Sequence, residues 1–349
     1  LPDEQKKQMS IQTAVVPLLH EGQKINLLDL PGNDDFVGET LGTLKVVNGA
    51  ILVVDGTVGV QVGTVKSWNL LRRSNIPVFI VVNKLDKEGA DFDKVLEDIK
   101  TQLGKEAVPF CYPLGHADKF DGFVNVVEMS AVKDNGEVKK GEELFADKKA
   151  QVESLHEAIM EAVAGTDDEL LDKYFSGEEL TKEDITKGLS LGIAAGDLVP
   201  VLVSSAGKNV GLKTLVEMLI SYLPSQADKV LEGVDDFGEK TTRKMNANEP
   251  FSAYVFKTSV DPYAGAISLM RINSGTLKVG DDVTCKKNSY RIGTLNSVCG
   301  KTLTSIQEAY AGDIVAVTRL DGVSSTDTLS SPKNVIVYPP LKYPSAVIF

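Results

Sequence analysis

The sequence predicts a doubly wound α/β domain with a mostly parallel sheet, followed by an antiparallel β-barrel. The α/β domain is indicated because apolar runs of strand length, at residues 25–28 and 78–82, alternate with segments of helical periodicity. The barrel is indicated because short β-branched runs, separated by Gly and Asp turns, fill residues 250–338. At 349 residues the chain is too long for a single core, so two or three domains are expected.

The elements follow one another in a recognisable order. Residues 1–116 and 193–225 are assigned to the α/β domain, 117–192 to an inserted α+β subdomain, 226–249 to a polar linker, 250–338 to the barrel, and 339–349 to the start of a further domain. Two helices are predicted from apolar stripes, one by Phe92, Val95, Ile99 and Leu103, the other by Leu212, Leu215, Leu219 and Leu223. Gly104 and Pro224 fit the ends of these two helices.

The first apolar run ends in a D-x-x-G motif, Asp29-Leu30-Pro31-Gly32. The carboxyl ends of strands are where open α/β sheets place their ligand sites. Asp29 is placed to hold Mg²⁺, directly or through water, as strand-end aspartates do in phosphate-transferring sites. Gly32 has no Cβ, so its backbone N–H can approach a γ-phosphate closely.

The second run ends in an N-K-x-D motif, Asn83-Lys84-Leu85-Asp86. The Asp86 carboxylate can accept two hydrogen bonds from the N1–H and the exocyclic amine of guanine. Adenine lacks that pair of donors and would leave the buried carboxylate unpaired. Asn83 can bridge the base and a neighbouring loop, and the methylene stem of Lys84 can lie over the base.

A third turn, Ser204-Ser205-Ala206-Gly207-Lys208, follows the apolar run 199–203. Here the Ala206 N–H can point at the guanine O6 atom while Ser205 steadies the Asp86 carboxylate. Gly207 belongs to the same nucleotide-binding turn. Asp and Asn also favour Asx turns at strand ends, but that explanation accounts for one of these motifs and not for all three. In this order and spacing, the motifs predict a guanine-nucleotide-binding domain.

The phosphate-binding motif G-x-x-x-x-G-K-[ST] does not occur in these 349 residues. The first residue is Leu1, a short way before the first predicted strand. We therefore expect the sequence to be a piece that begins inside a switch loop.

Together these motifs resemble bacterial translation elongation factor G, and more closely its divergent elongation-factor-G-like paralogues. The segment 29–36 (DLPGNDDF) parallels the family's D-T-P-G-H-x-D-F, and 49–55 (GAILVVD) its next strand. The segment 174–179 resembles the helical insert of that factor, and 222–225 the end of its G domain. The segments 261–265 (DPYAG), 271–277, 311–314 and 326–329 resemble its second domain. The resemblance implies a P-loop-NTPase-type G domain, the cofactors GTP or GDP and Mg²⁺, and GTPase activity.

The sequence departs from the family at Asn33, in the switch stretch 7–11, and at Leu30, which replaces a Thr. Asn33 stands where the family has a catalytic His that orients the attacking water, and it has no nitrogen that titrates near neutral pH. The switch stretch R-G-I-T-I of the family reads KQMSI here, in which Ser10 keeps a hydroxyl for Mg²⁺. Guanine recognition is expected to be unaffected, whereas efficient ribosome-triggered hydrolysis is in question.

The resemblance implies a cytoplasmic, monomeric factor that couples GTP hydrolysis to translocation on the ribosome. Alternatives are a ribosome-associated GTP-binding switch with weak hydrolysis, and a GTPase like ribosome-protection proteins or peptide-release factor 3. No apolar stretch has membrane-spanning length, so no membrane partner is expected.

The net charge of −12 disfavours contact with RNA. Residues 250–339, however, carry nine Lys and Arg against seven Asp and Glu, a balance of +2. Lys286, Lys287 and Arg291 lie close together in this part, and they fit either a solvated hairpin or a contact with ribosomal RNA.

We predict that the 349-residue polypeptide binds GTP and GDP weakly. The absent phosphate loop normally supplies three or four hydrogen bonds to a charged ligand, each worth about 1.5–3 kcal/mol. Affinity is therefore expected to fall by roughly 10³-fold or more, at about 1.4 kcal/mol per factor of ten. Isothermal titration calorimetry on this polypeptide measures it, and a sub-micromolar dissociation constant would contradict the argument.

Overall fold

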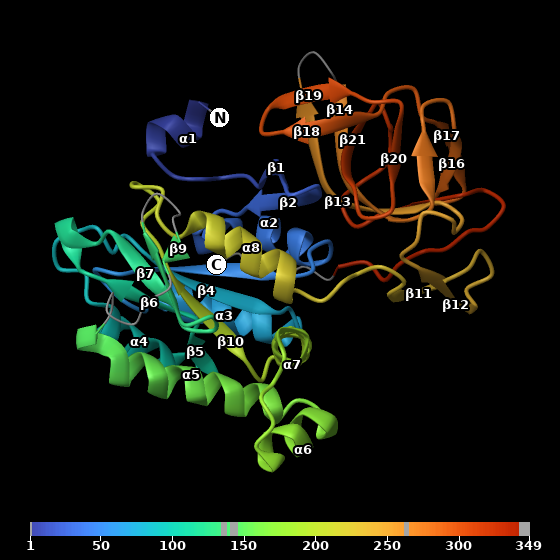
Figure 1. The fold of residues 1–349 in the computed structure, drawn as a ribbon. Coiled ribbons are helices and arrows are strands. Elements are labelled where there is room, and N and C mark those ends of the chain that lie inside the picture. Colours follow the sequence, from blue (N-terminus) through green and yellow to red (C-terminus); the bar gives the residue numbers. More distant parts are fainter. Residues whose placement is uncertain (1, 134–137, 140–145, 262–264, 342–349) are drawn as a thin grey trace. The chain divides into compact units, whose positions relative to one another are not determined.

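The computed structural model describes residues 2–133, 138–139, 146–261 and 265–341. The chain forms two compact units, one of residues 48–224 and one that joins residues 1–47 to residues 225–349 (Figure 1). Packing therefore groups residues 1–47 with the barrel, although the sequence assigns them to the α/β domain. The domain boundaries themselves stay a prediction.

The first of these units, residues 48–224, is built on a four-stranded parallel sheet. Its strands, in spatial order, are β3 (Ala50–Asp55), β4 (Val78–Asn83), β10 (Val199–Val203) and β5 (Ala107–Pro109). The central strands β4 and β10 read VFIVVN and VPVLV and are almost wholly buried, as expected for a sheet covered on both faces. The predicted α/β class with a parallel sheet is confirmed.

Three helices accompany this sheet: α3 (Val62–Arg73), α4 (Phe92–Gln102) and α8 (Leu212–Tyr222). Helix α4 follows the prediction, with Asp91 as its N-cap and with Phe92, Val95, Leu96 and Ile99 buried. Helix α8 differs, because it buries Thr214, Met218, Leu219 and Tyr222. Of the four leucines predicted to form its inner stripe, only Leu219 is fully buried, so the helix is rotated from the predicted face.

The inserted segment is mixed and then helical, as predicted. An antiparallel sheet contains β6 (Cys111–Leu114), β7 (Gly122–Asn125), β8 (Ser130–Lys133) and β9 (Val138–Lys139). The helices α5 (Lys149–Ala164), α6 (Asp168–Ser176) and α7 (Lys182–Ala195) follow, coloured green to yellow-green in Figure 1. Helices α6 and α7 end at Gly177 and Gly196, whose φ of 79° is the left-handed conformation that glycine adopts most easily. The Tyr112 hydroxyl donates to Asp93 at 2.9 Å and so ties β6 to α4.

The other unit contains an eight-stranded antiparallel sheet, drawn in orange and red in Figure 1. Its spatial order is β17 (Asn288–Arg291), β16 (Asp282–Cys285), β22 (Thr328–Ser330), β13 (Ser252–Asp261), β14 (Gly265–Ser274), β21 (Ile314–Thr318), β18 (Asn296–Cys299) and β19 (Thr302–Ser305). A pair, β15 (Thr276–Lys278) and β20 (Glu308–Tyr310), lies beside it. The predicted antiparallel barrel domain is confirmed.

The central strands of the barrel carry an apolar core on each face. On β13, Ala253 and Val255 belong to the interior cluster, while Tyr254 and Phe256 belong to a second cluster on the outer face. The second cluster is completed by Val15, Leu28 and Val46 from the N-terminal segment. That segment contains the helix α1 (Pro2–Lys7), the hairpin β1 (Ala14–His20) and β2 (Gln23–Asp29), the turn η1 (Asp34–Phe36) and the helix α2 (Val37–Leu44). Burial of apolar surface therefore attaches this segment to the barrel.

The stretch expected as a linker is partly ordered as a hairpin of β11 (Val230–Val234) and β12 (Lys240–Lys244). Leu231 packs against the second cluster, and Val234 forms a bridge to Val337. Residues 262–264 of the DPYAG segment and residues 342–349 lie outside the described residues. Among the helices that the structure describes, none has both the length and the apolar character needed to cross a membrane.

Candidate functional site

The carboxyl ends of three neighbouring parallel strands bring two of the three predicted polar motifs together. Asp55, at the end of β3, is the register partner of Asn83 at the end of β4, and Val82 of β4 pairs with Val203 of β10. The loops that begin at Asn83 and at Ser204 therefore lie side by side on one edge of the sheet. Strand register, more than local sequence, creates this proximity.

The Asp86 carboxylate is buried and held by two partners. Its Oδ1 atom accepts a hydrogen bond of 2.7 Å from the Ser205 hydroxyl, and its Oδ2 atom lies 3.2 Å from Nζ of Lys87. The side chain is 7% exposed. The Ser205 hydrogen bond lowers the pKa of Asp86 below its ordinary value, against a smaller raising effect of burial, and Lys87 adds to the lowering. The carboxylate is thus kept ionised and acceptor-only, which is the state needed to read a pair of N–H donors.

Asn83 ties its own loop to the second loop. Its Oδ1 atom accepts from the Ala206 N–H at 2.9 Å and from the Ser204 hydroxyl at 3.1 Å. The Ala206 N–H, expected to face a base oxygen, is therefore engaged by Asn83 in this structure. At the neighbouring Gly207 a Cβ would meet nothing within 4 Å, so the fold leaves open space beside this turn.

Lys84 adopts an unusual backbone conformation and points its amine at the end of β3. Its φ is 66°, in the left-handed region, and its Nζ donates to Oδ2 of Asp55 at 2.6 Å. Asp55 also accepts from the N–H and the hydroxyl of Thr57 at 2.9 and 2.7 Å. Burial alone would raise the pKa of Asp55, but the bonds from Lys84 and Thr57 outweigh it and lower that pKa.

Two residues of this edge were assigned no role by the sequence reasoning. Asp55 holds the Lys84 amine, and its signal in the sequence is only that a polar residue ends an apolar run there. Lys208 donates its backbone N–H to the Ser205 hydroxyl at 3.1 Å and its amine to the Asp118 carbonyl at 3.2 Å. Lys208 thereby supports the hydroxyl that in turn holds Asp86.

The residues predicted to bind Mg²⁺ lie in the other compact unit, at one end of the β1–β2 hairpin. Asp29 is the register partner of Ala14, and Ser10 lies in the segment that leads into β1. Asp29 is exposed, and in the part of the chain that the structure describes no hydrogen bond or ion pair engages its carboxylate. Carboxylate and hydroxyl oxygens are the hard donors that Mg²⁺ prefers, so these two residues fit that ion.

Gly32 and Asn33 follow directly on this hairpin. A Cβ at Gly32 would meet nothing within 4 Å and its φ is not left-handed, so the fold itself does not require glycine there. Asn33 is the N-cap of η1, and its Oδ1 atom accepts the Asp35 N–H at 3.0 Å. The oxygen of the amide expected to orient a water molecule is therefore engaged in a local turn.

A parallel sheet with N-K-x-D and S-A loops at its edge, in a chain that also carries an antiparallel barrel, defines a GTP-binding protein of the translation-factor class. Residues 1–225 match the family of the elongation factor Tu GTP binding domain, and residues 250–331 match elongation factor G domain 2. The chain therefore belongs to the elongation factor G family.

A solved structure supports the same assignment of fold. The chain is similar to a crystal structure of a protein from Thermus thermophilus, with 32% sequence identity and a TM-score of 0.82. The similarity covers 95% of this chain and 47% of that protein. The chain thus spans about half the length of the protein it matches.

We predict that Asp86→Asn in the full-length protein shifts nucleotide preference from GTP towards XTP. The amide of the new side chain can donate to the second carbonyl of xanthine, whereas it mismatches the guanine donors. Each hydrogen bond exchanged at a charged group is worth about 1.5–3 kcal/mol, so the affinity ratio should change roughly 10-fold to 100-fold per bond. Competition binding with the two nucleotides measures the ratio.

The matched control is Asp118→Asn, because Asp118 is an exposed aspartate of a neighbouring loop. It should leave the ratio unchanged. If Asp86→Asn keeps the parental preference for GTP, Asp86 does not read the base.

We predict that Ser205→Ala makes GTP binding more sensitive to acid. Ser205 depresses the pKa of Asp86, so its removal raises that pKa and the carboxylate becomes protonated at a higher pH on acidification. The control is Ser204→Ala, whose hydroxyl bonds to Asn83 and not to Asp86. Dissociation constants for GTP, measured as a function of pH, should show that acidification weakens binding at a higher pH in the Ser205 variant alone. Superimposable pH profiles for both variants and the parent would rule out this role.

Proposed function

We propose that the protein is a translation GTPase of the elongation factor G type, which couples GTP binding and hydrolysis to translocation on the ribosome. One observation carries this proposal: the Asp86 carboxylate is already ionised and oriented by Ser205, within a GTP-binding domain that precedes elongation factor G domain 2. A preorganised acceptor needs little rearrangement to bind guanine.

Base recognition in this proposal belongs to the sheet edge of residues 48–224. Asp86 accepts from two guanine donors, and Ser205 and Lys208 keep it in place. Asn83 holds the second loop through Ala206, and this N–H becomes available to the guanine O6 atom when Asn83 turns. Lys84 exchanges its contact with Asp55 for one with the nucleotide.

Phosphate chemistry in this proposal belongs to the hairpin end and the turn after it. Asp29 and Ser10 supply oxygen ligands for Mg²⁺, which when bound stabilises the negative charge that develops on the phosphates. Gly32 offers its N–H to the γ-phosphate, and the open space beside it admits this approach. Asn33 occupies the position at which the family's His orients the attacking water.

The ribosome, made of ribosomal RNA and proteins, is the proposed partner, and the hairpin β16–β17 is the proposed contact with its RNA. The two-residue turn of this hairpin is Lys286-Lys287, with left-handed φ values of 50° and 66°, and both lysines are exposed. Lys286 is 57% exposed although it pairs with Asp327 at 2.7 Å. The proposal places the factor in the cytoplasm, as a monomer.

A second candidate function is a ribosome-associated GTP-binding switch with weak hydrolysis. The observation that favours it is the capping bond of Asn33, because this bond holds the side chain in the turn and engages its oxygen. A GTPase like ribosome-protection proteins or peptide-release factor 3 is a further alternative. Two measurements separate these candidate functions: ribosome-stimulated GTP turnover, and movement of tRNA and mRNA on the ribosome. Turnover with movement supports translocation, turnover without movement supports the last alternative, and feeble turnover supports the switch.

We predict that Asn33→His in the full-length protein raises ribosome-stimulated GTP hydrolysis. An imidazole can orient the attacking water and, when protonated, offset developing negative charge, effects worth about 10²–10³ in rate. Single-turnover hydrolysis at saturating ribosomes separates chemistry from product release.

The control is Asn33→Ala, which removes the bond to the Asp35 N–H as the His variant does but adds no imidazole. The difference between the two variants isolates the imidazole. If Asn33→His does not exceed both the parent and Asn33→Ala, Asn33 is not the bottleneck, and the switch stretch around Ser10 becomes the better explanation.

A further inference from the structure

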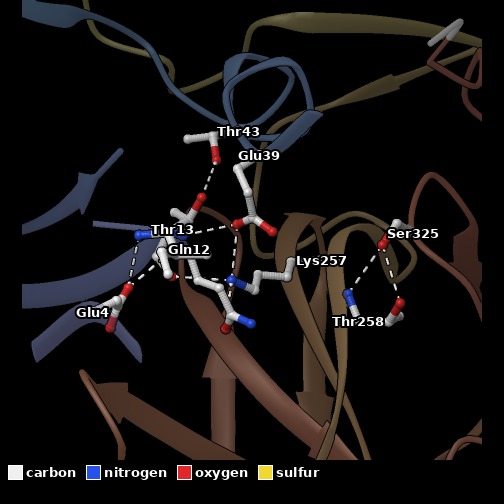
Figure 2. A network of polar contacts seen from close by, with 9 residues as sticks. Glu4, Gln12, Thr13, Glu39, Thr43, Lys257, Thr258 and Ser325 are labelled. Carbon is white, nitrogen blue, oxygen red and sulfur yellow. Dashed lines mark hydrogen bonds and ion pairs between the residues drawn. The ribbon is translucent and has the colours of Figure 1, made fainter. Parts of the chain in front are cut away.

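Lys257 on β13 is a cation that is nearly buried, with 10% of its side chain exposed. Such lysines are rare unless they are paired. Its Nζ atom lies 2.9 Å from Oε2 of Glu39, and 3.4 Å from both the Thr13 carbonyl and Oε1 of Gln12 (Figure 2). These three acceptors match the three donors of an ammonium group.

An irregularity of β13 turns Lys257 towards these partners. Val255 pairs with Met270 and Lys257 pairs with Leu269, so Phe256 is an extra residue, a β-bulge. In a regular strand Lys257 would share the face of Val255 and point into the barrel interior. The bulge puts Phe256 and Lys257 on the same outer side, where the N-terminal segment packs.

The same carboxylate oxygen that binds Lys257 also binds the backbone. Oε2 of Glu39 accepts the Thr13 N–H at 2.8 Å, and the Thr13 hydroxyl lies 3.4 Å from that of Thr43, one turn after Glu39 on α2. Burial alone would raise the pKa of Glu39, but the bonds from Lys257 and Thr13 outweigh it and lower that pKa. The Glu39 carboxylate is therefore ionised at neutral pH.

Lys257 thus contacts the two segments that lead to Ser10 and to Gly32, residues proposed to act on Mg²⁺ and the phosphates. Helix α2 begins directly after η1, in the loop that starts at Gly32, and Thr13 lies three residues after Ser10. A cleft of about 260 Å³ lies beside the network, lined by Asp35 and Phe36 of this loop and by Ser325 of the barrel. Packed side chains do not fill this space, so the polar bonds of the network help to hold α2 in position.

We propose that Lys257 is a positioning residue for GTP hydrolysis. Through Glu39 and the backbone of Thr13, it holds helix α2 and the start of β1 against the barrel, and so sets the position of Gly32, Asn33 and Ser10. This inference rests on the proposed function, and it adds that the barrel domain takes part in the reaction.

The first test measures hydrogen exchange of backbone amides in the full-length protein without nucleotide. Lys257→Met should speed exchange in residues 11–14 and 37–44 by about 10-fold to 100-fold, the effect of losing a hydrogen bond to a charged group. Lys257→Arg should restore protection. The matched control is Lys278→Met, which breaks an exposed ion pair with Glu308 in the same barrel and should change neither segment.

A double variant keeps the test decisive if Lys257→Met destabilises the protein by leaving Glu39 unpaired. Lys257→Met with Glu39→Gln removes both charges, which is often tolerated where one unpaired charge is not. The Gln oxygen still accepts the Thr13 N–H, so only the link to the barrel is lost. Faster exchange confined to the two segments supports the proposal. Parental exchange there, or equal loss of protection throughout the barrel, overturns it.

The second test measures single-turnover GTP hydrolysis at saturating ribosomes together with the dissociation constant for GTP. Lys257→Met and the double variant should slow hydrolysis about 10-fold to 100-fold, since small displacements of reacting groups have effects of this size. Guanine preference over xanthine, which depends on Asp86, should not change. Normal hydrolysis despite faster exchange overturns the role in the reaction. If the parent itself does not hydrolyse GTP, the proposed function fails, and the exchange experiment alone still decides whether Lys257 positions α2.

Discussion

The barrel's central strands are constrained by burial on both faces. On β13, β14 and β21, alternate residues enter the barrel interior or the second cluster, so each strand serves two cores at once. The outer core is completed by Val15, Leu28 and Val46, which come from the segment that carries the predicted phosphate-binding residues. The Arg271 guanidinium, almost fully buried, donates to the Val46 carbonyl at 3.1 Å and reinforces the same attachment. Burial of apolar surface drives this attachment, and the polar contacts, which are directional, fix its register.

The chemistry of the sheet edge depends on a different constraint, the alignment of parallel strands. Asp55, Asn83 and Ser204 are far apart in sequence, yet strand register places them at one edge. Each loop then supports another: Lys208 supports Ser205, Ser205 orients Asp86, and Asn83 fixes Ala206. Such a chain of bonds keeps a carboxylate ionised in a buried place, which isolated burial would oppose.

The fold class and the polar residues at the strand ends could be predicted because their signals in the sequence are local. Apolar runs of strand length end in Asp29 and Asn83, and a strand end with polar residues indicates a ligand site wherever it occurs. The role of Asp55 could not be predicted, because its contact with Lys84 requires the register of two strands. The contact of Lys257 with Glu39 could not be predicted either. Glu39 lies 218 positions away in the sequence, and only the bulge in β13 directs Lys257 towards it. The Asn33 capping bond was also not predicted, because the resemblance to the family assigns this position to orienting the attacking water.

The bulge at Phe256 has a consequence for how related sequences should be aligned. A relative that lacks one residue at this point would have a regular strand, with Val255 still opposite Met270 and Lys257 still opposite Leu269. Every later side chain of β13 would keep its face, and only the contact of the Phe256 ring with the outer cluster would be lost. A gap placed at Val255 would instead align the outer Phe256 with an inner residue of the relative. Position 256 is therefore where natural length variation in this strand can be accommodated.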